Sequence, residues 1–159
     1  MYIRIADEAD LSEIQRLLRT SNLPVEDVSR AVIEGFLVAE GVGGSVIGIG
    51  GLEQLGSNVL LRSLIVAPEA RGKGIARELV ARLEDNARAC GQQYVWLLTT
   101  TAERFFERIG YKRVSREDVP GEVRLCRQFA ALCPSTASCM RKRLRTASSA
   151  PIAERPVSN

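Results

Sequence analysis

Apolar residues recur along this chain at two spacings, and the change from one to the other predicts an order of helices and strands. An apolar residue at every third or fourth position predicts a helix over residues 11–19, with Asp10 as its N-cap. The same spacing begins again at Ile75 and predicts the longest helix of the chain, which ends before Gly91. The chain therefore carries two strong helices that lie far apart in sequence.

Short apolar runs between turn residues predict the strands. The run over residues 59–66 is apolar at all but two positions, which is typical of a central strand covered on both faces. The glycine-rich turn at 41–44 predicts that the strands 36–40 and 46–52 pair as an antiparallel hairpin. Further strands are expected at residues 2–5, 94–98, 111–114 and 137–144, shorter helices at 25–32 and 101–109, and a loop with one helical piece at 115–135.

The length of 159 residues and the hydrophobic content of 45% fit one domain with a core of its own. We expect this domain to cover residues 1–144, because residues 145–159 are rich in Ser, Ala and Pro and predict a disordered tail. The apolar runs are far shorter than the roughly 18 residues of a membrane-spanning helix. The first residues lack the pattern of a secretory signal. A cytoplasmic protein without a membrane partner is therefore expected.

The net charge of +3 is concentrated at one end of the chain. Residues 141–159 hold five Lys/Arg against one Glu, which leaves 17 of the 22 basic and 18 of the 19 acidic residues elsewhere. A nearly neutral body lacks the clustered positive charge that a phosphate backbone requires, so no nucleic-acid partner is expected. The basic run is interpreted as the end of a strand and a disordered terminus; the alternative is a protein that binds through this tail.

The chain has no histidine. This excludes Ser-His-Asp and Cys-His catalysis and every metal site with a His ligand, and we expect no metal cofactor. The four cysteines form no CxxC pair and are expected to be free thiols. One hypothesis gives Cys126, Cys133 and Cys139 a soft ion such as trivalent arsenic; the alternative is that they are small buried side chains.

The segment between the central strand and the long helix carries the most informative chemistry. Residues 71–76 read Arg-Gly-Lys-Gly-Ile-Ala. Glycines let a ligand approach the backbone, and the free N–H groups at a helix start favour a diphosphate. The spacing fits neither a Walker loop nor a Rossmann fingerprint. Taken alone, Gly-x-Gly more often marks only a tight strand-to-helix turn.

With the preceding Leu-Ile-Val-Ala-Pro at 64–68, this segment resembles the coenzyme A motif of the GNAT superfamily of N-acetyltransferases. A second likeness, to the family's aromatic helix followed by Gly-Tyr, lies at residues 102–111, and the resemblance as a whole covers residues 2–144. It implies an α+β fold of three α/β/α layers. Helices would flank a mixed, mostly antiparallel sheet that is splayed at the cofactor site.

The resemblance also implies a reaction, in which acetyl-CoA is the cosubstrate and its acetyl group passes directly to a primary amine of a small molecule. Pantetheine would pair with the backbone of the central strand, and the diphosphate would lie at the start of the long helix. A homodimer is common in such folds. The residues that the resemblance assigns to the cofactor are Leu64, Ile65, Val66, Arg71, Gly72, Lys73, Gly74, Ile75, Ala76, Thr99 and Phe106.

Direct transfer requires a deprotonated amine, a polarised carbonyl and an exit for the thiolate. Glu53 ends a strand beside the expected splay and is the candidate base; the alternative is a solvent-facing strand end. A backbone N–H of residues 64–66 is the candidate oxyanion donor. Phe106 stands where the family usually has a tyrosine, so Tyr111 or a threonine at 99–101 is the candidate acid. Tyr111 is alternatively a core residue.

A narrower likeness joins residues 51–53, 61–63, 97–106 and 133–140 to the GNAT branch found with arsenic-resistance genes. It implies an acceptor such as an arsenic- or phosphorus-containing amino acid, or another toxic amine. Arg62 would bind the acid group of this acceptor; the alternative is a solvated strand charge. Two other functional classes stay open: a non-catalytic or regulatory coenzyme A-binding module, and a protein N-acetyltransferase.

Overall fold

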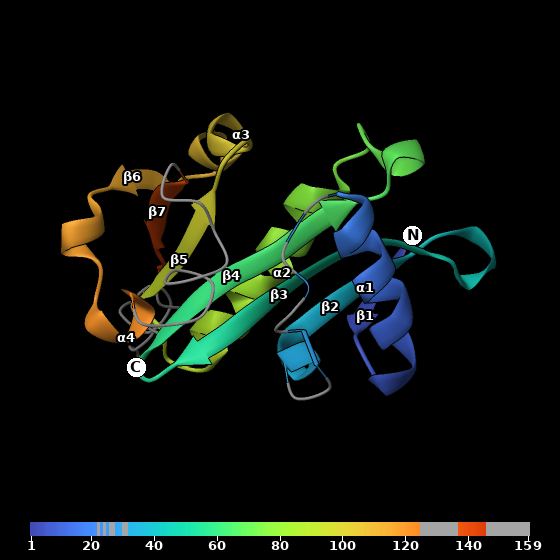
Figure 1. Cartoon of the computed structure of the whole chain (residues 1–159), viewed down its shortest axis with the longest axis horizontal. Helices are drawn as coiled ribbons and strands as arrows, with labels where there is room; N and C mark the ends of the chain where they lie inside the picture. Colours follow the sequence, from blue (N-terminus) through green and yellow to red (C-terminus); the bar gives the residue numbers. More distant parts are fainter. Residues whose placement is uncertain (22, 24, 26–27, 30–31, 125–136, 146–159) are drawn as a thin grey trace, which may run out of the picture.

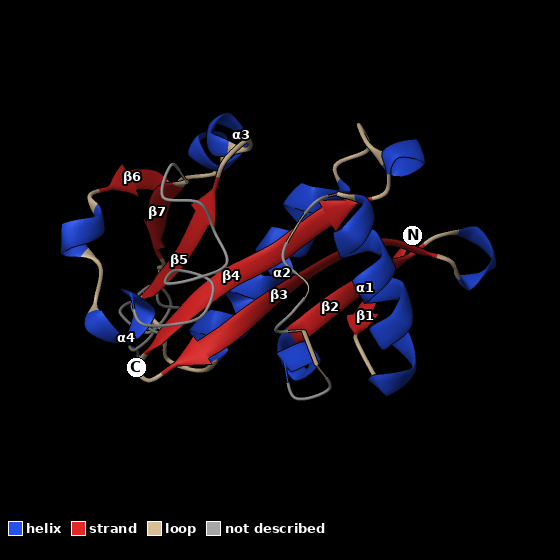
Figure 2. Ribbon diagram, viewed as in Figure 1, coloured by secondary structure: helices blue, strands red, loops and turns tan. Residues whose placement is uncertain are grey.

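The computed structural model describes residues 1–21, 23, 25, 28–29, 32–124 and 137–145. It contains seven strands and four α-helices, together with short 3₁₀ turns (Figures 1 and 2). The strands are β1 (Tyr2–Ile5), β2 (Phe36–Glu40), β3 (Val46–Leu55), β4 (Asn58–Val66), β5 (Tyr94–Thr99), β6 (Lys112–Val114) and β7 (Ser138–Arg143). The helices are α1 (Leu11–Thr20), α2 (Ile75–Ala89), α3 (Glu103–Arg108) and α4 (Gly121–Arg124).

All seven strands form one sheet in the order β1-β2-β3-β4-β5-β7-β6. Every neighbouring pair is antiparallel except β4 and β5, which are parallel. The connection between these two strands is α2, which packs on one face of the sheet, while α1 packs on the other. The mixed, mostly antiparallel sheet between helices confirms the expected fold class.

The sheet opens between its two parallel strands. β4 and β5 pair only at Val59↔Val95 and Leu60↔Trp96, near the start of both strands. Beyond this row the two strands diverge, and Figure 1 shows β4 and β5 as the arms of a V. Among the described residues, the edge of β4 that faces this gap has no strand partner along the rest of its length. The predicted splay is therefore confirmed at the predicted strand.

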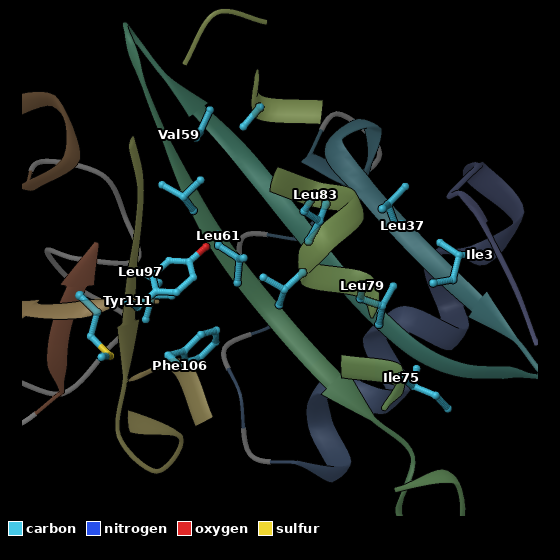
Figure 3. Close-up of a cluster of buried hydrophobic side chains, with 14 of the residues drawn as sticks. Ile3, Leu37, Val59, Leu61, Ile75, Leu79, Leu83, Leu97, Phe106 and Tyr111 are labelled. Carbon is cyan, nitrogen blue, oxygen red and sulfur yellow. The ribbon is translucent and has the colours of Figure 1, made fainter. Parts of the chain in front are cut away.

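Three buried clusters hold the sheet and its helices together. The largest lies beneath α2, where Leu79 and Leu83 meet Leu61 and Leu97 of the two parallel strands (Figure 3). A second cluster lies beneath α1 on the opposite face of the sheet. The third packs Leu60 and Trp96 against the segment around α4. Residues of β4 alternate between these faces, so this strand is covered on both sides as its apolar run predicts.

The start of α1 differs from the prediction. Asp10 precedes the helix but makes no capping hydrogen bond to it. Its carboxylate instead binds the Arg4 guanidinium at 2.8 and 2.9 Å and accepts the backbone N–H of Asp7. Asp7 and Asp10 thus form a capping box around a 3₁₀ turn, Glu8–Asp10. The Arg4 ion pair holds the pKa of Asp10 below its usual range.

Other boundaries shift by a few residues. The third strand extends to Leu55, and the helix expected at 101–109 spans only Glu103–Arg108. The helix expected at 25–32 and most of the loop at 115–135 lie on or beside residues outside the described part, as does the tail from residue 146. In the described part of the chain, no helix has the length and apolar content to cross a membrane.

Candidate functional site

A cleft of about 1040 Å³ lies where the separated part of β4 meets the start of α2. One of its walls consists of β4 and the loop that leads into α2. The other walls come from the last turns of α1 and the segment that begins α3. Its lining residues are Arg16, Leu17, Thr20, Ser21, Leu23, Leu64, Ile65, Val66, Ala67, Pro68, Glu69, Ala70, Arg71, Gly72, Gly74, Ile75, Ala76, Arg77, Thr101, Ala102 and Phe105.

A β-bulge shapes the β4 wall. Between the pairs Ile49↔Ile65 and Gly51↔Arg62, β3 contributes one residue and β4 contributes two. The extra residue is Ser63, whose φ of 59° is the only positive φ of a non-glycine residue in the described part of the chain. A bulge bends the strand that carries it, which is what a strand leaving its neighbour requires. Leu64, Ile65 and Val66, predicted to face the cofactor, line the cleft directly after the bulge.

The loop between β4 and α2 presents its backbone to the same cleft. Gly72 and Gly74 have φ of 82° and 81°, a conformation that other residues rarely adopt, and nothing lies within 4 Å of a Cβ built on either. Gly74 is the N-cap of α2 and supplies no side-chain acceptor, so the first N–H groups of α2 stay available to a ligand. These groups and the helix dipole favour an anion at this end of the cleft.

Charged side chains around the cleft are mainly basic. Arg16, Arg71 and Arg77 line it together with one carboxylate among the described residues, Glu69. The Nε of Arg71 donates to the carbonyl oxygen of Val66 at 3.0 Å, which ties the loop to the end of β4. That carbonyl therefore already has a partner. The positive balance reinforces the preference for an anionic ligand.

Eight of the eleven residues predicted to bind the cofactor line this cleft, and three do not. Lys73 is exposed on the loop and is not among the lining residues. The hydroxyl of Thr99 accepts the N–H of Ala102 at 3.0 Å and closes the turn before α3. Phe106 is buried at 4% exposure in the core, and its neighbour Phe105 lines the cleft. The α1 residues of the lining were not predicted, because their sequence carries an ordinary amphipathic pattern.

Glu53, the candidate base, lies in the last row of the sheet in which β4 and β5 are still paired. It is opposite Leu60, which in turn pairs with Trp96. Its Oε1 accepts a hydrogen bond from Nη1 of Arg62 at 3.2 Å. The Arg62 side chain is only 1% exposed and that of Glu53 is 26% exposed. The structure brings these two predicted residues together as an ion pair at the vertex of the splay, outside the lining of the cleft.

Arg62 is further held by the bulge. Its Nε donates to the hydroxyl oxygen of Ser63 at 3.1 Å. A buried guanidinium with fixed partners is not the solvated strand charge of the alternative interpretation, which is therefore wrong. Its role toward an acceptor stays a prediction.

Tyr111, the candidate acid, lies in the core beneath α2. It is 2% exposed, and its hydroxyl donates to Oε2 of Glu84 at 2.9 Å (Figure 3). Burial, and then the negative charge of Glu84, raise the pKa of Tyr111 above its ordinary value. The other oxygen of Glu84 accepts a hydrogen bond from Nζ of Lys142 at 3.0 Å. Tyr111 does not line the cleft, and its hydroxyl is committed to Glu84.

Two of the four cysteines, Cys90 and Cys139, lie in the described part of the chain. Cys90 is exposed and Cys139 is buried, and both are free. Burial raises the pKa of Cys139 to about 11. Cys126 and Cys133 lie outside the described residues. Within the described ranges no three His, Cys, Asp or Glu side chains are grouped as metal ligands.

A family model and two curated proteins match half or more of this chain in sequence. A family model described as "Acetyltransferase (GNAT) domain" matches residues 33–113, about half of the chain. An amino-acid acetyltransferase of Mycobacterium tuberculosis is 35% identical over 102 residues, which are 61% of this chain and 58% of that protein. An uncharacterized N-acetyltransferase of Chlorobaculum tepidum is 38% identical over 80 residues, 50% of this chain and 48% of that protein. The chain thus spans about half the length of these curated relatives.

A solved structure extends the likeness to almost the whole chain. Rv2747 from Mycobacterium tuberculosis, crystallised in complex with CoA and NLQ, superposes with a TM-score of 0.79 at 27% identity. The superposition covers 91% of this chain and 100% of that one.

Proposed function

Because this chain belongs to the GNAT acetyltransferase family, we propose that it transfers the acetyl group of acetyl-CoA directly to a primary amine of a small molecule. The observation that carries the proposal is the cleft, which joins the stretch of β4 that has separated from β5 to the open start of α2. A long ligand with a diphosphate at one end and an amide-bearing arm at the other matches these two surfaces. The Mycobacterium tuberculosis structure with bound CoA supports the same ligand.

In this proposal the diphosphate lies against the N–H groups of residues 71–76 and the arginines at that end of the cleft. The pantetheine arm runs along Leu64–Val66, on the side of β4 where pairing with β5 has ended. The thioester then lies near the vertex of the splay. A backbone N–H of the bulged segment would stabilise the oxyanion that forms there, which requires no particular side chain.

Glu53 is the proposed base. An amine of pKa about 8 is largely protonated at neutral pH, and it must lose its proton before it can attack the thioester. Glu53 is partly exposed at the vertex, where an acceptor amine would approach β4 from the face opposite α2. The departing thiolate belongs to a thiol of pKa about 8.5 and leaves as an anion without an acid. We therefore assign no step to Tyr111.

The acceptor that we favour carries an acidic group beside its amine. Arg62 is two residues along β4 from the row of Glu53 and shares its face of the sheet. An ion pair of this kind matches a zwitterion, whose ammonium faces the carboxylate and whose acid faces the guanidinium. The similarity to an amino-acid acetyltransferase supports this class. Within it we propose, from the narrower sequence likeness, arsenic- or phosphorus-containing amino acids and a role in detoxification.

A thiol-release screen with acetyl-CoA tests the proposal. The panel holds natural amino acids, their arsenic- and phosphorus-containing analogues, polyamines, aminoglycosides and peptides with free amino termini. Turnover is expected with amino acids and to fall when the carboxylate of the same amino acid is amidated. Turnover with peptides alone would establish protein N-acetylation instead.

One observation favours a second function. The hydroxyl of Tyr111 and the carboxylate of Glu53 both already form hydrogen bonds within the protein. The alternative is a module that binds coenzyme A without catalysis. Calorimetric binding of CoA together with no thiol release across the whole panel would support the module and reject the enzyme.

A further inference from the structure

The wall of the cleft formed by α3 and the residue before it, called the α3 wall, depends on contacts with the rest of the protein for its position. α3 has six residues, and Phe106 is the buried one among them. An isolated helix of this length is unstable, so its place depends on what its few buried atoms contact. Ala102 and Phe105 at this helix line the cleft opposite the start of α2. The position of Phe106 therefore determines where this wall stands.

A continuous set of contacts runs from this wall into the core. The ring of Phe105 meets that of Phe106 edge to face, with centroids 5.1 Å apart. Phe106 meets Tyr111 in the same manner at 5.4 Å. The backbone N–H of Tyr111 also donates to the carbonyl oxygen of Phe106 at 2.9 Å, which ends α3. Tyr111 thus holds both the ring and the backbone of the residue that anchors the wall.

Tyr111 is in turn bonded to the helix that forms the other wall. Its hydroxyl donates to Glu84 of α2 at 2.9 Å, and Ile75, Ala76 and Arg77 at the start of α2 line the cleft. Lys142 of β7 binds the second oxygen of Glu84 at 3.0 Å and so fixes the orientation of this carboxylate. Apolar contacts alone allow packed elements to shift, whereas a buried hydrogen bond to a charged group is directional. Figure 3 shows Phe106 and Tyr111 together between β4 and β5.

We propose that the hydrogen bond between Glu84 and Tyr111 sets the distance between the start of α2 and the α3 segment, and thereby the affinity for acetyl-CoA. Glu84 and Tyr111 are positioning residues, and neither contacts the acetyl group. Lys142 supports them by neutralising and orienting Glu84. That the ligand is acetyl-CoA rests on the proposed function. The connection from α2 to the α3 segment through Glu84, Tyr111 and Phe106 does not.

Calorimetric titration of the full chain with CoA and with acetyl-CoA tests this role. Tyr111→Phe and Glu84→Leu both remove the bond and are expected to weaken binding by about tenfold. Glu84→Gln keeps an oxygen that accepts from Tyr111 and is expected to stay within about threefold of the wild type. In steady-state assays the loss should appear in the KM for acetyl-CoA, with kcat and the KM for the acceptor nearly unchanged.

Two controls separate positioning from general destabilisation. Asp85→Asn changes the exposed carboxylate next to Glu84 on the same helix and should leave affinity unchanged. Val38→Ala weakens the core beneath α1, on the other face of the sheet, and should lower the unfolding temperature without changing affinity. All titrations are made well below the unfolding temperature of each variant.

The outcomes are distinct. Equal CoA affinity in the wild type, Tyr111→Phe and Glu84→Leu would overturn the positioning role while leaving coenzyme A binding intact. No CoA binding by the folded wild type would reject the proposed function itself. A kcat that falls in Tyr111→Phe but not in Glu84→Leu, at unchanged affinity, would make Tyr111 an acid and overturn the inference.

Discussion

Two ion pairs lie on opposite faces of the sheet, and they are built in opposite ways. In the pair at the vertex of the splay the cation is buried: Arg62 is 1% exposed and Glu53 is 26% exposed. In the pair beneath α2 the anion is buried: Glu84 is 7% exposed and Lys142 is 24% exposed. Each pair therefore has one buried partner and one partner that reaches solvent.

The difference determines what each pair can do. A partly exposed carboxylate can exchange a proton with an incoming amine, as Glu53 is proposed to do. A buried carboxylate that already accepts from an ammonium and a phenol, as Glu84 does, has little capacity left for chemistry. The second pair is suited to holding elements in place. Ion pairs with similar contact distances are thus proposed to have different roles, reaction for one and positioning for the other.

Glu53→Gln should have the largest effect. If Glu53 is the base, kcat falls on the order of 10²-fold while the affinity for CoA stays the same. In that case the wild type is expected to lose rate on acidification, because a protonated carboxyl cannot accept the proton of the amine. The variant has no such group and loses this part of the pH-rate profile.

Glu117→Gln changes an exposed carboxylate that does not line the cleft; it serves as the control for Glu53→Gln and is expected to keep the wild-type profile. A wild-type profile in Glu53→Gln itself would show that Glu53 is only the partner of Arg62.

Within each pair, removal of the exposed partner should cost more stability than removal of the buried one. Lys142→Met leaves the buried Glu84 charge with a neutral donor and is expected to lower the free energy of unfolding by about 3 kcal/mol. Glu84→Leu fills the site with an apolar group and leaves Lys142 free to reach water, so roughly half that loss is expected. Urea unfolding measures both. The reverse order would mean that burial of Glu84 is stabilising by itself.

The bulge that carries the first pair can be tested at Ser63. A β-branched side chain is strained at a φ near 59°, whereas glycine is not. Ser63→Val is therefore expected to be less stable than Ser63→Gly by about 2 kcal/mol in urea unfolding. Ser63→Gly also removes the hydroxyl that accepts from Arg62 and separates this contact from the strain. Equal stability of the two variants would mean that the bulge relaxes.

Much of the cleft wall formed by β4 and the start of α2 could be predicted, because its parts are contiguous in sequence. The apolar run of β4, the glycines at 72 and 74 and the amphipathic start of α2 follow one another in sequence. The second wall comes from α1 and the α3 segment, which lie elsewhere in the chain. Nothing local in the amphipathic pattern of α1 marks Arg16 or Thr20 as lining residues.

Each ion pair has one charged residue that interrupts an apolar pattern in the sequence. Arg62 interrupts an apolar strand and is therefore a candidate site residue. Glu84 interrupts the apolar face of α2 between Leu83 and Ala87 in the same manner but was not recognised. Its partners Tyr111 and Lys142 are 27 and 58 residues away, so no local pattern links them. The sequence predicts Asp10 as a helix cap for a related reason, because its partner Arg4 lies on a different element.

The smallest effect concerns the face that carries Arg62, where Cys139 packs in the third cluster. Burial raises the pKa of Cys139 to about 11, so very little thiolate is present at pH 8. Iodoacetamide should therefore modify the exposed Cys90 before Cys139, and modification of Cys139 should accelerate about tenfold per pH unit up to that pKa. Mass spectrometry of the two peptides follows both rates. Fast modification of Cys139 at pH 8 would mean that this face opens, in contrast to the closed core around Glu84.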